Sequence, residues 1–193
     1  AGIFSFYPAK MLGAPGDGGM VVTNDAHLAR KVKALRDNGR VESSDVIECF
    51  GYCSRLDNLH AAILNTKLKH FARWIERRRE IAKMYAEGLK DAKDIILPPN
   101  KGKDLFDVYQ NYVIRTEKRD ELVKHLNGSG VEVLVSWPKP MHHQKALHLD
   151  HFHLPITERI SNEVLSLPMY PELTDEEIKY VIDCILSFLH KTG

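Results

Sequence analysis

The chain has 193 residues, 44% of them hydrophobic and 27% charged, enough for one large domain or a domain and a half. Its 27 basic and 26 acidic residues nearly cancel, which argues against nucleic acid or an anionic membrane as a partner. The apolar runs are too short to span a membrane, no signal peptide is apparent, and the three cysteines lack zinc-ligand spacing. We therefore expect a reduced, cytoplasmic protein.

The first elements are expected around a glycine-rich loop. Residues 4–6 predict a buried strand, and because it comes so early we expect that something preceding it is absent or supplied by another chain. Residues 19–23 predict a second strand. Asn24 or Asp25 then caps a predicted helix that ends near Asn38, where Asn38-Gly39 supplies the stop signal.

A loop over residues 40–55 leads to a long helix predicted for residues 56–89. Apolar residues at helical spacing predict its buried stripe: Leu59, Ala62, Ile63, Leu68, Phe71, Trp74, Ile75, Ile81, Met84 and Tyr85. The arginines at 77–79 lie between Glu76 and Glu80, which favours a solvated face with pairing between neighbouring turns over nucleic-acid binding.

The pattern changes after Pro98-Pro99. A strand over 109–115, a helix over 117–126 and a strand over 131–135 predict a β-α-β unit, with glycines at 128 and 130 as the break. The run from Thr174 to Glu177 predicts an N-terminal cap for a helix reaching about His190. We expect two α/β domains, over residues 1–90 and 91–193.

Lys10 is the first candidate for chemistry. It follows a strand in a turn packed with aromatic residues, where partial desolvation would disfavour the ammonium form and leave the amine nucleophilic toward an aldehyde. Ser5 offers a hydroxyl to an anion, although it could equally bond to the backbone of a strand. Taken alone, a lysine in a glycine-rich loop is more often a plain connection, and the P-loop order is missing.

The order of residues extends this interpretation. The run F-S-F-Y-P-A-K-M-L-G-A-P-G-D-G-G-M-V-V-T-N-D resembles the lysine segment of the DegT/DnrJ-type sugar aminotransferases, a branch of the fold-type-I pyridoxal-phosphate enzymes. The similarity continues in R-D-N-G-R at 36–40, G-Y-C-S-R-L-D at 51–57, Y-Q-N-Y-V-I-R at 109–115, P-M-H-H-Q at 140–144 and S-L-P-M at 166–169. It implies an α/β chain made of the C-terminal part of the large domain plus the small α/β domain of such an enzyme.

By this resemblance Lys10 would hold pyridoxal 5'-phosphate covalently and move a proton, and Ser5 would donate to the cofactor phosphate. Tyr7 and His142 would face the substrate. Arg55 would lie near the active site of a neighbouring subunit, so a homodimer is expected. The resemblance also implies a nucleotide-linked keto-sugar substrate, an amino donor such as glutamate, and a place in polysaccharide biosynthesis.

Two residues depart from the family pattern. Cys53 stands where the family usually has an Asn that reaches the cofactor phosphate across the dimer, and His60 stands where Gln is common. The family's acidic partner of the pyridine nitrogen lies upstream of the lysine. A non-catalytic remnant or regulatory binding protein, and a fragment made by truncation or proteolysis, are therefore alternatives to the enzyme.

Several histidines also invite a metal-site interpretation. His142, His143, His148, His151 and His153 occur together with Asp150, but their spacing is irregular. We expect an exposed, solvated loop and no metal ion there, with His142 as the family substrate contact.

Overall fold

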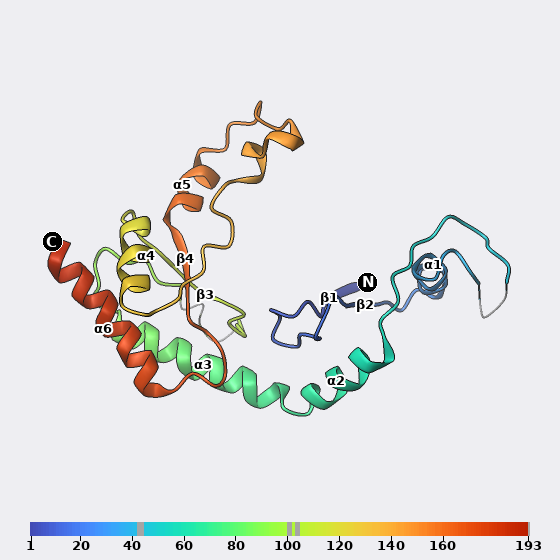
Figure 1. Ribbon diagram of the computed structural model, residues 1–193, viewed down its shortest axis with the longest axis horizontal. Helices are drawn as coiled ribbons and strands as arrows, with labels where there is room; N and C mark the ends of the chain where they lie inside the picture. Colours follow the sequence, from blue (N-terminus) through green and yellow to red (C-terminus); the bar gives the residue numbers. More distant parts are fainter. Residues whose placement is uncertain (42–44, 100–101, 103–104, 193) are drawn as a thin grey trace. The chain divides into compact units, whose positions relative to one another are not determined.

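The computed structural model describes residues 1–41, 45–99, 102 and 105–192 (Figure 1). Contacts between Cα atoms divide the chain into two compact units, Ala1–Ala72 and Arg73–Gly193. Each unit mixes helices and strands, as expected for an α/β protein. The predicted domain boundary at residue 90 stays a prediction. Within the described part of the chain, no helix is both long enough and apolar enough to cross a membrane.

The first unit begins with an antiparallel pair of strands, β1 (Gly2–Ser5) and β2 (Gly19–Val22), in which Gly2 lies opposite Val22. Helix α1 (Ala26–Arg36) follows, and the Asp25 side chain accepts hydrogen bonds from the N–H groups of His27 and Leu28 at 2.8 and 3.1 Å. The predicted cap is therefore confirmed at Asp25.

Of the strand predicted to be buried over residues 4–6, Phe6 is buried and the other two residues are exposed. Ile3 is 85% exposed and Phe4 is 52% exposed, and the apolar residues of β2 are exposed as well. The reason is the width of the sheet: β1 pairs only with β2 among the described strands, so this two-stranded ribbon has little surface of its own to bury both faces.

The single long helix predicted for residues 56–89 is wrong. The structure has α2 (Asn58–Leu68) and α3 (Phe71–Gly88), separated by a turn at Lys69 and His70. The N–H groups of these two residues donate to carbonyls three residues back, and the Thr66 hydroxyl donates to the Ala62 carbonyl at 3.1 Å. Such hydrogen bonds from a threonine compete with the helical ladder and tend to bend helices.

The predicted buried stripe holds only in part. Ile81 and Tyr85 of α3 are fully buried, whereas Leu59 and Leu68 of α2 are exposed. Helical spacing identifies the apolar face of each helix, but among the predicted stripe residues full burial occurs on α3 and not on α2.

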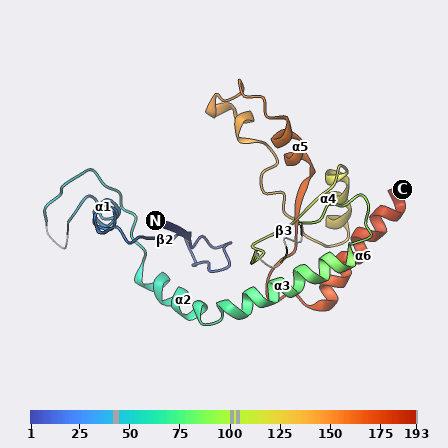
Figure 2. The same cartoon turned by 180° about the vertical axis from the view of Figure 1, so that it is seen from behind.

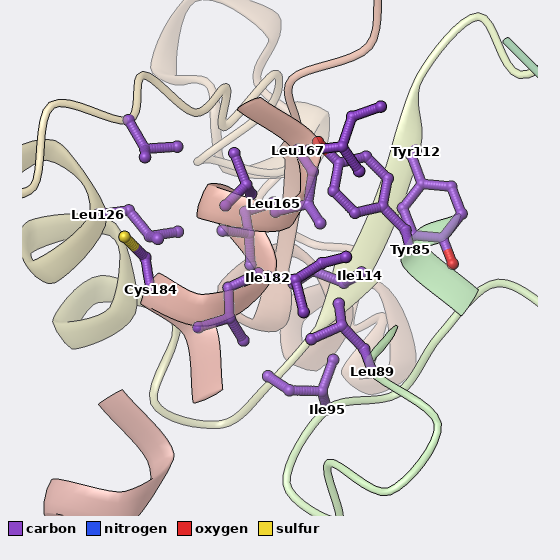
Figure 3. Close-up of a cluster of buried hydrophobic side chains, with 14 of the residues drawn as sticks. Tyr85, Leu89, Ile95, Tyr112, Ile114, Leu126, Leu165, Leu167, Ile182 and Cys184 are labelled. Carbon is purple, nitrogen blue, oxygen red and sulfur yellow. The ribbon is translucent and has the colours of Figure 1, made fainter. Parts of the chain in front are cut away.

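The second unit is built on an antiparallel pair, β3 (Tyr112–Arg115) and β4 (Val164–Leu167). Its helices are α4 (Arg119–Gly128), α5 (Pro155–Glu163), α6 (Asp175–Thr192) and most of α3, with short 3-10 turns η1 (Met141–His143) and η2 (Lys145–Leu147). Figure 3 shows the core between α3, α4, α6 and the two strands, where Tyr85, Leu89, Ile114, Leu165 and Ile182 converge.

The predicted β-α-β unit is also wrong. The partner of β3 is β4, in antiparallel register, and residues 131–135 form only an isolated bridge between Leu134 and Ser166. Pro138 and Pro140 follow that segment. Because proline has no N–H to donate and restricts the residue before it, the chain does not continue as a regular strand.

The arginines predicted to be solvated instead hold the second unit together. Arg78 is buried, and its Nη1 donates to the carbonyls of Tyr109, Gln110 and Met169 at 2.9–3.2 Å. Arg77 donates to the Leu173 carbonyl at 2.7 Å, and Arg79 lies over the Phe106 ring at 4.1 Å from its centroid.

The predicted cap of the last helix is confirmed. The Glu177 carboxylate accepts from the backbone N–H of Thr174 at 2.8 Å, and the Thr174 hydroxyl oxygen accepts from the N–H of Glu177 at 3.2 Å. This reciprocal pair is a capping box, and it starts α6 at the predicted residue.

Candidate functional site

The loop between β1 and β2 presents Lys10 in a fixed backbone frame. The Lys10 N–H donates to the Tyr7 carbonyl at 2.8 Å, which closes a tight turn. At the base of the loop, the Phe6 N–H donates to the Gly18 carbonyl and the Ala14 N–H to the Phe6 carbonyl, both at 2.8 Å. These hydrogen bonds therefore fix the backbone conformation of the loop both at the Lys10 turn and at the base of the loop.

Close packing reinforces that frame. A Cβ at Gly13 would lie 2.4 Å from the Pro8 carbonyl oxygen, so only glycine allows this approach. The Lys67 ammonium of α2 donates to the Gly13 carbonyl at 2.5 Å. Phe6, Ala14 and Leu64 form a small buried cluster beneath the loop.

His60, one of the two departures from the family pattern, also contacts this loop. Its half-buried ring packs against Gly16, where an added Cβ would meet the ring at 3.0 Å. The imidazole therefore supports the backbone of the lysine loop from α2.

The side chains of the predicted cofactor contacts, Lys10 and Ser5, and of the predicted substrate contact Tyr7 are exposed. Lys10, Ser5 and Tyr7 all face solvent in the first unit, so the expected partial desolvation of Lys10 is wrong for this chain by itself. Among the described residues of this unit, α2 packs against the loop at Gly13, Ala14 and Gly16, and this contact leaves the Lys10 side chain exposed. The Ser5 oxygen accepts from the Tyr7 N–H at 3.3 Å, which leaves its hydroxyl proton available for an anion.

Arg55 lies in the first unit beside a cationic cavity. Its Nη1 donates to Asp37 at 3.1 Å and its Nη2 lies 3.9 Å from the Cys53 sulfur. The cavity, of about 660 Å³, is lined by Asp37 and five cationic side chains: Arg30, Lys33, Arg36, Arg40 and Arg55. This excess of positive charge suits a phosphorylated or otherwise anionic ligand.

His142 lies in the second unit and is buried, in contrast to the exposed loop predicted for it. Its Nε2 hydrogen-bonds to Glu158 Oε1 at 3.1 Å, and the same oxygen accepts from the Leu154 N–H at 3.0 Å. The Leu154 N–H, and after it His142, hold the pKa of the Glu158 carboxyl below its ordinary value. This bonded carboxylate keeps the His142 ring in place.

Glu158 was missed by sequence reasoning. It is 16 residues from His142 and belongs to a different element, so no local spacing connects the two. Lys67 was missed for the same reason, because its contact with Gly13 spans 54 residues. The structure brings Lys10, Ser5 and Tyr7 together on one loop, whereas His142 belongs to the other unit.

Comparison with known proteins decides the family. Residues 1–186 match the DegT/DnrJ/EryC1/StrS aminotransferase family. The chain belongs to this family.

Individual relatives agree with the family match. The chain is 41% identical over 192 residues to a "Pleiotropic regulatory protein" of Geobacillus stearothermophilus, covering 97% of this chain and 51% of that protein. It is 40% identical over 192 residues to a UDP-N-acetyl-3-dehydro-alpha-D-glucosamine 3-aminotransferase of Acidithiobacillus ferrooxidans, covering 98% of this chain and 51% of that protein. The chain therefore spans about half the length of the curated relatives it matches.

Solved structures agree on the fold. The family aminotransferase from Brucella abortus superposes with a TM-score of 0.89 at 35% identity, covering 97% of this chain and 50% of that one. DesV of S. venezuelae, solved in complex with a ketimine intermediate, gives a TM-score of 0.91 at 38% identity, with 97% and 51% covered. The predicted family and α/β fold class are thus confirmed, with the match to the C-terminal half of a fold-type-I aminotransferase.

Proposed function

We propose that this chain is the C-terminal half of a pyridoxal-phosphate-dependent aminotransferase that acts on a nucleotide-linked keto-sugar. The observation that carries the proposal is the family match over residues 1–186, which includes Lys10 on its fixed loop. The relative from Acidithiobacillus ferrooxidans is named as a nucleotide-sugar aminotransferase, which favours that substrate class.

The residues of the lysine loop suit pyridoxal phosphate. Lys10 offers an exposed amine for the cofactor aldehyde, at a position that three backbone hydrogen bonds define. Ser5 retains a hydroxyl proton for the cofactor phosphate. When bound, the cofactor supplies the electron sink that aminotransfer needs, and the Lys10 amine would then accept and return the proton of the reacting carbon.

The remaining residues are assigned to the substrate. Tyr7 shares the loop of Lys10 and would face the sugar, and the buried His142 would donate or accept one hydrogen bond to it. The cationic cavity beside Arg55 suits the phosphate groups of a nucleotide. By family resemblance Arg55 would act toward the neighbouring subunit of a homodimer.

A cytoplasmic location belongs to the same proposal. Cys49, Cys53 and Cys184 are free thiols, and two of them are exposed, which favours a reducing compartment. The amino donor is expected to be an amino acid such as glutamate, and the product an amino sugar for polysaccharide synthesis.

The decisive experiment is covalent trapping of the cofactor. We expect the chain incubated with pyridoxal phosphate to take up one equivalent, which borohydride then fixes on the peptide that contains Lys10. Lys10→Ala should lose at least about 90% of that label, because no other amine has the same loop around it. Lys69→Ala, at the exposed end of α2, is the matched control and should label normally.

Labelling spread evenly over surface lysines would contradict the assignment of Lys10. Aminotransfer is measured in the same samples, with glutamate and a nucleotide-linked keto-sugar as substrates. Specific labelling of Lys10 without any transfer would favour a cofactor-binding, non-catalytic protein over the enzyme.

A further inference from the structure

Two histidines and a glutamate form a cluster in the second unit. His142 and His143 are neighbours on η1, and Glu158 lies on the first half of α5. One ligand atom from each, two imidazole nitrogens and a carboxylate oxygen, lies within 4.8 Å of both others. His153, just before α5, brings its Nδ1 to 3.8 Å from the same Glu158 oxygen.

We propose that His142, His143 and Glu158 bind a divalent transition-metal ion of the zinc type. Two imidazoles and one carboxylate are a ligand set that zinc uses in proteins. Metal binding itself needs neither the cofactor nor the sugar, but it would place His142 on the ion instead of the sugar contact given above. Titration of the chain therefore tests it without any measurement of aminotransfer.

The distances are close to those that a metal ion requires. Ligand atoms at about 2.0–2.1 Å from a tetrahedral zinc lie about 3.3 Å from one another. Glu158 Oε1 is 3.1 Å from His142 Nε2 and 3.8 Å from His143 Nε2. Because the His143 side chain is 43% exposed, it is free to close the remaining few tenths of an ångström.

Hydrogen bonding alone does not explain the whole cluster. The Glu158 oxygen already has two partners within hydrogen-bond distance, the Leu154 N–H at 3.0 Å and His142 at 3.1 Å. His143 and His153 stand at 3.8 Å, too far for hydrogen bonds to that oxygen. A cation held by His142, His143 and Glu158 would give the His143 nitrogen a partner within this group.

One ligand is already held in place. The Leu154 N–H fixes the Glu158 carboxylate, and such supporting hydrogen bonds orient metal ligands. In both views of the chain, α5 and the segment before it extend away from the β3–β4 pair (Figures 1 and 2). An ion would join η1 to the start of α5 and close the intervening segment into a loop.

The experiment is metal titration of the full chain after treatment with a chelator. We expect one Zn²⁺ per chain by calorimetry, and Co²⁺ in its place should give visible absorbance bands. Glu158→Gln and His143→Ala should each weaken Zn²⁺ binding at least about 10-fold, because each removes a direct ligand. His148→Ala and His151→Ala change exposed histidines of the same segment and should bind as the unchanged chain does.

A comparison of the two ligand variants and one further variant keep the result unambiguous. Glu158→Gln also alters the start of α5, whereas His143→Ala leaves the Leu154 hydrogen bond intact, so weaker binding in His143→Ala cannot be attributed to loss of that contact. A Cys49→Ser/Cys53→Ser chain should still bind Zn²⁺. The proposal is overturned if the chain binds no metal ion, if His143→Ala binds normally, or if only the cysteine variant loses the ion.

Discussion

The two units of the chain bury their apolar side chains to very different extents. In the first unit, Phe6, Ala14 and Leu64 form the buried cluster, and Leu12 and Leu56 pack against it. In the second unit, a continuous core draws on α3, α4, α6 and both strands (Figure 3). The second unit thus has a hydrophobic core of ordinary extent within its own sequence.

The first unit instead leaves apolar surface uncovered. Its exposed large apolar side chains include Ile3, Phe4, Met20, Val21, Val22, Ile47, Phe50, Leu59 and Leu68. A cavity of about 900 Å³ lies among β1, β2 and α1, with Phe4, Val21 and Val32 in its lining. Exposed apolar surface of this kind is typical of regions that contact other protein. One unit therefore buries many of its large apolar side chains, whereas the other buries few and leaves many exposed.

The largest expected effect tests the core of the second unit. Leu122 of α4 is fully buried, and Leu122→Ala should lower the free energy of unfolding of that unit by about 2–5 kcal/mol, through lost burial and a cavity. Leu59→Ala changes an exposed residue of α2 and should alter the free energy of unfolding of the first unit by less than about 0.5 kcal/mol. Denaturant unfolding, monitored by hydrogen exchange in each unit, measures the stability change caused by each variant. Equal stability losses in the two variants would contradict the difference in burial between the two units.

A smaller effect concerns the buried tyrosines of the second unit. Burial raises the pKa of Tyr112 to about 12 from 10.0, so the unfolded chain ionises first as the pH rises. Stability is therefore kept below pH 10 and lost as the pH rises above it, by on the order of 1 kcal/mol at pH 11.

The measurement compares unfolding at pH 9 and pH 11. Tyr112→Phe lacks the ionising hydroxyl and should lose on the order of 1 kcal/mol less stability than the unchanged chain between the two pH values. Tyr52 of the first unit is exposed and gives the control, since Tyr52→Phe should leave the difference unchanged. The same loss in Tyr112→Phe as in the unchanged chain would contradict the burial argument.

The smallest effect compares the two helix caps. Thr174→Ala removes half of the capping box of α6 and should cost the second unit about 1 kcal/mol. Asp25→Ala removes the cap of α1 at a similar local cost. Because α1 contributes Ala34 as its buried residue, we expect Asp25→Ala to act locally, as faster amide exchange in α1. A global loss from Asp25→Ala would show that the first unit folds more cooperatively than its core suggests.

Sequence reasoning succeeded where the signal is local. The caps at Asp25 and Thr174 were predicted because a side chain bonds to backbone a few residues away. The family assignment rested on ordered motifs along the chain, and the match over residues 1–186 confirmed it. Lys10 was identified in the same way, and its role stays a proposal.

Sequence reasoning failed where distant segments decide the outcome. The pairing of β3 with β4 joins residues about 50 positions apart, and residues 131–135 offered an equally plausible strand nearer in sequence. Arg78 looks like a surface arginine in its charged run, yet its three carbonyl partners lie 31 to 91 residues away. The carboxylate beside His142 was invisible for the same reason.

The sequence by itself determined the family, the α/β class and the starts of α1 and α6, because motif order, spacing and capping act between near neighbours. Only the tertiary structure decided which apolar faces are covered, which charges are buried, and which side chains gather around Glu158. Whether a side chain is buried, and which distant side chains it meets, depends on segments far apart in the chain. The stabilising free energy therefore arises only when the whole structure packs.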